Sequence, residues 1–145
     1  MSGKQLNVIR ILPPQIPQFW DIVKHTAHLM YPEGVTEAAL VDVLHSLLSD
    51  KAQLWLALNE ERKVIIVCMT AIINDVYTNK KVLHLKNLYS YERGSDWIDA
   101  FSSVLEFAKK NGCEAITSNS FGGPALAVAE KVGMRKSFTR YILEI

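Results

Sequence analysis

Several features that often reveal a protein's function are scarce or missing in this chain. There are only two cysteines, Cys68 and Cys113, and their separation fits neither a metal site nor a redox pair. Basic and acidic residues nearly balance, 16 against 15, so the charge does not favour a nucleic acid as partner. No apolar run is long enough to cross a bilayer, because a run such as Val64–Ile73 has only the length of a strand. The sequence therefore predicts no metal centre, no nucleic-acid partner and no membrane partner.

The composition that remains is that of an ordinary globular domain. Hydrophobic residues make up 49% and charged residues 21% of the 145 residues, which suits a single domain over residues 1–145. No internal repeat or low-complexity linker divides the chain. Both cysteines are expected to be reduced, and Met1–Gln5 precede no apolar run of the kind found in signal peptides. These points favour a cytoplasmic location.

Hydrophobic periodicity divides the chain into helices and strands. Helices are predicted from Ile16, after Thr36, over Asp96–Asn111 and from Pro124 to Val132. Strands are predicted over Val8–Leu12, Ala52–Leu58, Lys63–Ile73, Val82–Tyr89, Glu114–Ser118 and Ser137–Ile145. Short polar turns between the three central strands indicate an antiparallel meander, and the helix that follows indicates a parallel crossover. The order β-α-α-β-β-β-α-β-α-β gives a mixed sheet with helices packed on it.

The junction Tyr91–Trp97 is the best candidate for a cofactor site. An apolar strand, Val82–Tyr89, leads into it, and a strongly amphipathic helix begins at Asp96. The start of a helix offers backbone N–H groups and a favourable dipole to an anion such as phosphate. The sequence therefore predicts that a phosphate-bearing cofactor would be held here.

The order of elements resembles that of the GNAT family of N-acetyltransferases over nearly the whole chain. Two local matches support the resemblance: Glu130–Met134 is similar to the end of the family's late helix, and Arg93 stands where the family has arginine or glutamine. The resemblance implies an α/β (α+β) fold whose mixed, mostly antiparallel sheet has helices on both faces. It also implies acetyl-CoA as cofactor, held by Leu88, Tyr89 and Ser90 on the strand, by Arg93, Gly94 and Ser95 in the loop, and by Asn119.

The chain also departs from the family pattern at three positions. Asp96 and Ile98 occupy the two positions where the family's loop has glycine or alanine, and Ala129 replaces a tyrosine that in many members protonates the leaving thiolate. Glycine lets the backbone approach phosphates closely, whereas Asp96 competes for the helix N–H groups and repels a pyrophosphate. Two functions stay open: an N-acetyltransferase acting on an unidentified small-molecule or peptide amine, and a catalytically inactive GNAT-fold module with a binding or structural role.

Acetylation of an amine needs a group that removes a proton from the amine. His84, on the strand before the junction, is the best titratable candidate; it also fits a half-buried strand histidine with a hydrogen-bond partner. Tyr141 is the candidate for the missing acid and also fits a core or rim aromatic. Its strand, with the apolar segment Tyr141–Leu143, would permit pairing in a homodimer. His25 and His28 lack supporting ligands, so we interpret them as a surface pair rather than a zinc site.

Overall fold

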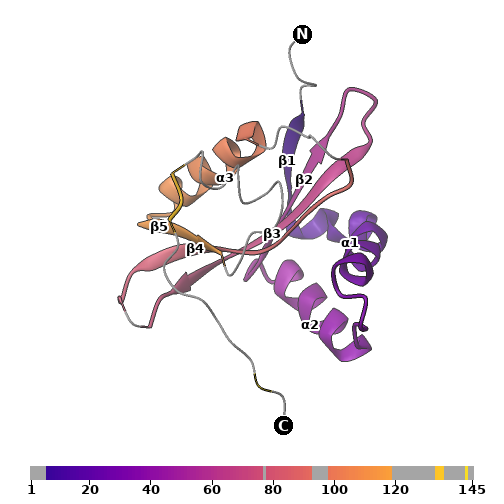
Figure 1. Ribbon diagram of the computed structural model, residues 1–145, viewed down its shortest axis with the longest axis horizontal. Helices are drawn as coiled ribbons and strands as arrows, with labels where there is room; N and C mark the ends of the chain where they lie inside the picture. The colour runs from indigo at the N-terminus through magenta and orange to yellow at the C-terminus, as the bar shows by residue number, and fades with distance from the viewer. Residues whose placement is uncertain (1–5, 77, 93–97, 119–132, 136–142, 144–145) are drawn as a thin grey trace.

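The structure, a computed structural model, describes residues 6–76, 78–92, 98–118, 133–135 and 143. The described strands form one sheet in the order β1-β2-β3-β4-β5, with α1 and α2 on one face and α3 on the other (Figure 1). The strands are β1 Asn7–Ile11, β2 Gln53–Leu58, β3 Val64–Asn74, β4 Lys81–Ser90 and β5 Ala115–Ser118. The helices are α1 Ile16–Met30, which follows a 3-10 turn at Pro13–Gln15, α2 Glu37–Leu48 and α3 Ile98–Lys110.

The strand directions confirm a mixed, mostly antiparallel sheet. The pairs β1-β2, β2-β3 and β3-β4 are antiparallel. The pair β4-β5 is parallel. Helix α3 joins this parallel pair, in the crossover that the sequence predicts. The described helices and strands also follow the predicted order as far as β5. The helix predicted from Pro124 to Val132 and the strand predicted over Ser137–Ile145 lie outside the described residues.

Two helix ends have residues suited to terminate a helix. Thr36 caps α2, because its side-chain oxygen accepts a hydrogen bond from the N–H of Ala39 at 3.1 Å. Gly112 lies two residues beyond the end of α3, and its φ of +73° is a left-handed conformation that glycine adopts without strain. The N–H of Cys113 then donates to the carbonyl of Ala108 at 2.9 Å, which satisfies one carbonyl of the last turn.

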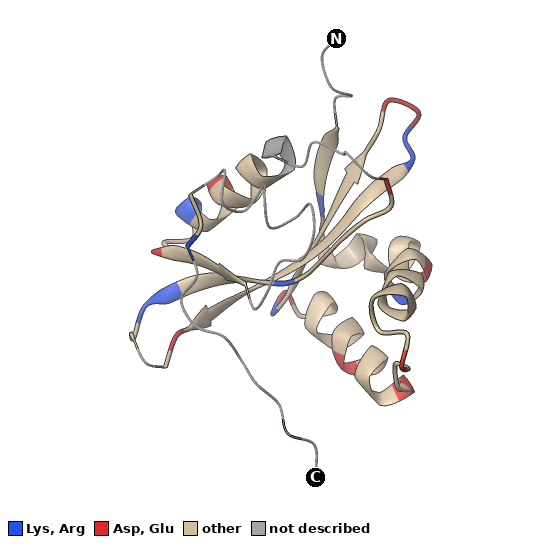
Figure 2. Ribbon diagram, in the orientation of Figure 1, with Lys and Arg blue, Asp and Glu red and all other residues tan. Residues whose placement is uncertain are grey.

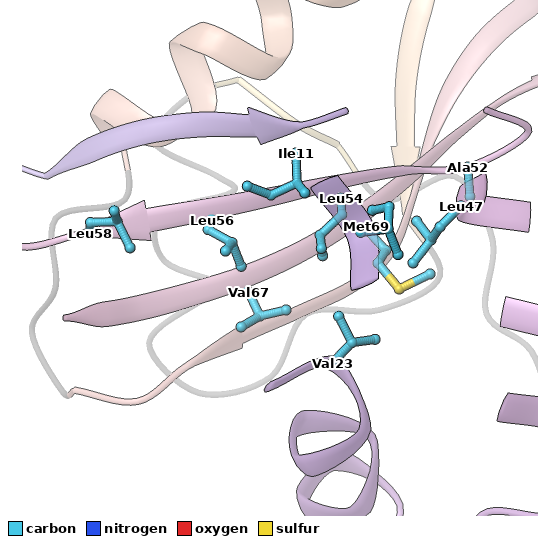
Figure 3. Close-up of a cluster of buried hydrophobic side chains, with 10 residues drawn as sticks. Ile11, Val23, Leu47, Ala52, Leu54, Leu56, Leu58, Val67 and Met69 are labelled. Atoms are coloured by element: carbon cyan, nitrogen blue, oxygen red, sulfur yellow. The ribbon is translucent and has the colours of Figure 1, made fainter. Parts of the chain in front are cut away.

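Strand β2 is apolar on both faces, so the sheet needs a cover on each side. Leu54, Leu56 and Leu58 alternate along the strand with Trp55 and Ala57, and all five are buried. The three leucines face the layer formed by α1 and α2. The same cluster contains Ile11, Val23, Leu47, Ala52, Val67 and Met69 (Figure 3).

The opposite face of the sheet packs against α3. The ring of Trp55 meets Phe107 of this helix edge-on, with 5.3 Å between the ring centroids. Cys68 is buried in this layer, and burial raises the pKa of its thiol to about 12. The thiol is therefore protonated at neutral pH and packs as a small apolar group. The cluster is completed by Leu83, Leu85, Val104 and Ala108.

A chain of hydrogen bonds crosses the buried sheet on this face. The hydroxyl of Thr70, which is 0% exposed, accepts from Nε1 of Trp55 at 3.0 Å and donates to Oε1 of Gln53 at 2.9 Å. The amide of Gln53 in turn donates to the carbonyl of Asp50 at 3.2 Å. The side-chain polar groups of Trp55, Thr70 and Gln53 thereby have hydrogen-bond partners, as burial of polar groups requires.

Replacing Thr70 tests this chain. Thr70→Val keeps the shape of the side chain but leaves the Trp55 donor and the Gln53 acceptor unpaired, so we expect a loss of about 2 kcal/mol in the free energy of unfolding. Thr70→Ser is the matched control, since it keeps the hydroxyl and removes only a methyl group. Urea unfolding measures both variants. A valine variant as stable as the serine variant would show that the hydrogen bonds contribute little.

Candidate active site

Strand β4 is longer than the strand that pairs with its outer edge. β5 pairs with β4 as far as Leu85↔Ser118 and ends there, whereas β4 continues to Ser90. The other edge of β4 stays paired with β3 up to Ile66↔Ser90. Within the described residues, the outer edge of β4 therefore has no strand partner beyond Leu85.

A β-bulge interrupts β4 at the same point. Met69 of β3 pairs with Asn87 and Thr70 pairs with Leu85, so Lys86 is an extra residue in the ladder. Neighbouring side chains of a regular strand point to opposite faces, yet Lys86 and Asn87 both line the pocket described below. The bulge thus places two adjacent polar side chains on the face covered by α1 and α2.

One hydrogen bond fixes the direction of the backbone beyond the bulge. The N–H of Tyr91 donates to the carbonyl of Ile65 at 2.7 Å and therefore points toward β3. Because N–H groups alternate in direction along a strand, that of Tyr89 also points toward β3 and that of Leu88 points to the outer edge. The predicted cofactor residues Leu88, Tyr89 and Ser90 all lie on this last part of β4.

Tyr91 holds the end of β4 against α1. Its hydroxyl lies 2.7 Å from Oγ1 of Thr26, which donates its own hydrogen to the carbonyl of Ile22 at 2.7 Å. Since threonine has one hydroxyl hydrogen, Tyr91 is the donor to Thr26. The ring of Tyr91 stacks on His25 with centroids 6.2 Å apart and meets Tyr89 edge-on at 4.9 Å. The first residue of the predicted phosphate loop is therefore fixed to the helix.

His84 lies on β4 two residues before the extra residue of the bulge and is half-buried. Its Nδ1 is 2.9 Å from Oγ1 of Thr117, its register partner on β5. Burial lowers the pKa of His84 below its ordinary value of 6.5, and the positive charge of Lys86 lowers the pKa further. The imidazole is therefore neutral at pH 7, and Thr117 is the partner that a half-buried strand histidine needs.

A pocket of about 400 Å³ lies beside the bulge, between the sheet and the layer of α1 and α2. This volume is within the range of small-molecule sites, about 300–1,000 Å³. Much of the wall is apolar, with Val23, Ala27, Met30, Leu40, Val67 and Met69. The polar lining includes Thr26, Thr36, Lys86 and Asn87, and no described lining residue is acidic. Figure 2 shows that the Asp and Glu residues of the α1 and α2 layer lie on these two helices and on the segment that connects them, and none of them lines the pocket.

The site differs in extent from the one that the sequence predicts. Of the predicted site residues, the structure describes His84 and Leu88–Ser90, which lie on the same strand on either side of the bulge. Outside the described residues lie Arg93, Gly94, Ser95, Asn119 and Tyr141. The pocket, Thr117 and the bulge are not identified by sequence reasoning. The adjacent polar pair Lys86-Asn87, inside a strand of alternating character, is the local signal for the bulge.

Two further observations concern the part of the chain that the structure describes. There, no cluster of three or more histidine, cysteine, aspartate or glutamate side chains is arranged to hold a metal ion, and His25 contacts Tyr91 instead. In the same residues, no helix combines the length and the apolar character needed to cross a membrane.

No protein-family model matches the sequence, and no curated protein matches it. Solved structures match its fold. An aminoglycoside acetyltransferase from an uncultured soil metagenomic sample, in complex with sisomicin, has a TM-score of 0.74 at 13% identity over 97% of this chain and 96% of its own. A predicted acetyltransferase with acetyl-CoA from Clostridium acetobutylicum has a TM-score of 0.69 at 18% identity over 97% and 96%. A ribosomal-protein-alanine N-acetyltransferase from Brucella melitensis biovar Abortus 2308 has a TM-score of 0.66 at 12% identity over 97% and 100%.

The chain has the GNAT fold. In that fold, two parallel strands splay apart and admit the pantetheine arm of coenzyme A, and β4 and β5 are the parallel pair here. The bulge at Lys86 lies directly beyond the point where the pairing of these two strands stops, at Leu85 and Ser118. At these identities the likeness establishes the architecture, and the chemistry must be argued from the residues of this chain.

The lowered pKa of His84 has a consequence for stability. His84 binds a proton more weakly in the folded protein than in the unfolded chain, so protonation favours unfolding. The stabilisation is present above pH 6.5 and is lost as the pH falls below 6.5 toward the lowered folded pKa. We therefore expect His84→Gln to destabilise the protein more at pH 8 than at pH 5, as measured by urea unfolding. A difference between the two proteins that is the same at both pH values would contradict the lowered pKa.

Proposed function

We propose that the protein is an acetyl-CoA-dependent N-acetyltransferase that acts on a small-molecule or peptide amine in the cytoplasm. The observation that carries the proposal is the position of the bulge at Lys86, where the outer edge of β4 and the 400 Å³ pocket meet. Beyond Leu85, no described strand pairs with the outer edge of β4, and such a backbone edge suits the amide groups of a pantetheine arm, while the pocket suits an acceptor. The names of the structural neighbours include acetyltransferases of an aminoglycoside and of a ribosomal protein.

The proposal assigns coenzyme A to the end of β4 and to the loop that follows it. The N–H of Leu88 faces the outer edge of β4, where it can donate to the pantetheine arm or to the thioester carbonyl. Arg93, Gly94 and Ser95 would hold the pyrophosphate at the start of α3, against the opposing charge of Asp96. When bound, acetyl-CoA supplies an acetyl group activated as a thioester.

His84 is the proposed base in this site. It is neutral at pH 7, so it can accept a proton from the attacking amine. This role requires the tautomer with hydrogen on Nδ1, which donates to Oγ1 of Thr117 and leaves Nε2 as the acceptor. Thr117 is then a positioning residue, because its hydroxyl accepts from Nδ1 in this tautomer and holds the orientation of the ring. Tyr141 is the proposed acid for the leaving thiolate.

Binding of acetyl-CoA separates this function from an inactive GNAT-fold module. Isothermal titration calorimetry should show binding to the wild-type protein. Arg93→Ala should weaken it by removing a phosphate contact, and Asp96→Gly should strengthen it by removing a negative charge and restoring a close backbone approach. Lys80→Ala, at an exposed turn position, is the control. An absence of binding at millimolar acetyl-CoA would favour the inactive module.

The base is tested by rate measurements. His84→Gln should lower kcat by about a hundredfold or more, the usual effect of losing a general base, while the Kd for acetyl-CoA stays within about twofold. In the wild-type protein, kcat/KM should fall at acid pH with a midpoint below 6.5, because protonated His84 cannot accept the proton. Unchanged kcat in the glutamine variant would assign the base elsewhere.

A further inference from the structure

The wall of the pocket selects against a strongly cationic acceptor. The described lining offers apolar side chains from α1, α2 and β3, no carboxylate, and a single charged group, Lys86. A polyamine or an aminoglycoside carries several ammonium groups, and each would lose water here without gaining an anionic partner. This wall therefore suits an acceptor with a large apolar part and at most one ammonium group.

At the sheet end of the pocket, Lys86 provides a positive charge that suits an anionic group of the acceptor. Among the described residues, no carboxylate lies within ion-pair distance of Lys86. The bulge turns its side chain to the pocket beside Asn87, whose Nδ2 has only a weak contact with the sulfur of Met30 at 4.0 Å. An ammonium group and an amide at one end of an apolar pocket are suited to a carboxylate.

The position of this pair also fixes where the acceptor's amine must lie. Lys86 and Asn87 are at the point where the pairing of β4 with β5 stops, beside the proposed thioester position. In an α-amino acid, the amine and the carboxylate share one carbon atom. A carboxylate held by Lys86 therefore keeps the amine next to the reacting centre and directs the side chain toward Val23, Met30 and Leu40.

We propose that the acceptor is a free α-amino acid with an apolar side chain, whose carboxylate binds Lys86 and whose side chain fills the pocket between the sheet and the layer of α1 and α2. The inference rests on the proposed function. In the reaction, a bond forms between the amine nitrogen and the acetyl carbon and the bond from that carbon to sulfur breaks. The amine loses one proton and the leaving thiolate gains one to become the free thiol, so no oxidant or further reactant is needed.

The test compares acceptors that differ in one group. L-leucine, L-methionine and L-phenylalanine are measured beside L-leucinamide and phenethylamine, which lack the carboxylate, and beside spermidine and sisomicin, which carry several ammonium groups. Release of free coenzyme A thiol gives kcat and KM. We expect kcat/KM at least tenfold higher for the free amino acids than for the other acceptors.

Variants then assign the effect to Lys86. Lys86→Gln should raise KM at least tenfold for L-leucine and change KM for L-leucinamide less than twofold, because only the acid has the charge that Lys86 binds. Lys81→Gln, which removes an exposed lysine at the start of the same strand, should change neither. Equal use of L-leucine and L-leucinamide, preference for sisomicin, or efficient use of apolar N-terminal peptides would overturn the inference.

The two proposals fail in different ways. If calorimetry shows that acetyl-CoA does not bind, the transferase is excluded, and the pocket is tested alone by NMR titration with L-phenylalanine. Amide shifts at Thr36 and Asn87 in the wild-type protein that disappear in Lys86→Gln would support the carboxylate site. If acetyl-CoA binds but the amino acids are not acetylated and cause no such shifts, the transferase stands and the proposed acceptor class is wrong.

Discussion

The arrangement of the whole molecule follows from one constraint: the central strands are apolar on both faces. Leu54, Leu56 and Leu58 require a cover on one side of β2, and Trp55 requires a cover on the other. Helices α1 and α2 cover the first face before the meander begins. After β4, the chain must cross the second face as α3, so the next strand runs parallel to β4. The pairing changes from antiparallel to parallel at β4 because helices must cover both faces of the sheet. The candidate site lies at this change.

A single extra residue then determines what the site presents. Without the bulge, Lys86 and Asn87 would point to opposite faces, and one of them would enter the layer against α3. With the bulge, both reach the pocket, and His84 stays on the part of β4 that pairs with β5, where Thr117 holds its ring. The first part of β4 pairs with β5 and orients the imidazole of His84. The second part, beyond Leu85, has no strand partner on its outer edge among the described residues. A transfer reaction requires that its reacting groups be held in position, and the pairing of β4 with β5 does this for His84.

The sequence predicts the fold well because each described element has a strong local signal. Thr36 and Gly112 mark helix ends, and the strands are long apolar runs separated by polar turns, so element type, order and direction follow from local chemistry. The site is less predictable. His84 is found from its residue type alone, but Thr117 becomes its partner only through the register of β4 with β5, across the intervening helix. The pocket arises from the packing of α1 against β3 and β4, which no local pattern encodes. Arg93 and Asp96 stay predictions, since they lie outside the described residues.

The order of strands in the sheet is the same as their order in the chain. The β2-β3-β4 meander therefore contains mostly local pairings, closed by short turns, and its assembly costs little loop entropy. By contrast, β1 meets β2 only after both α1 and α2 have been accommodated between them, and β5 meets β4 only after α3. We therefore expect the meander to form early in folding and the two outer strands to join it later. The parallel edge that forms the candidate site thus belongs to the part of the molecule whose contacts span the longer stretches of sequence, where opening requires no disruption of the central meander.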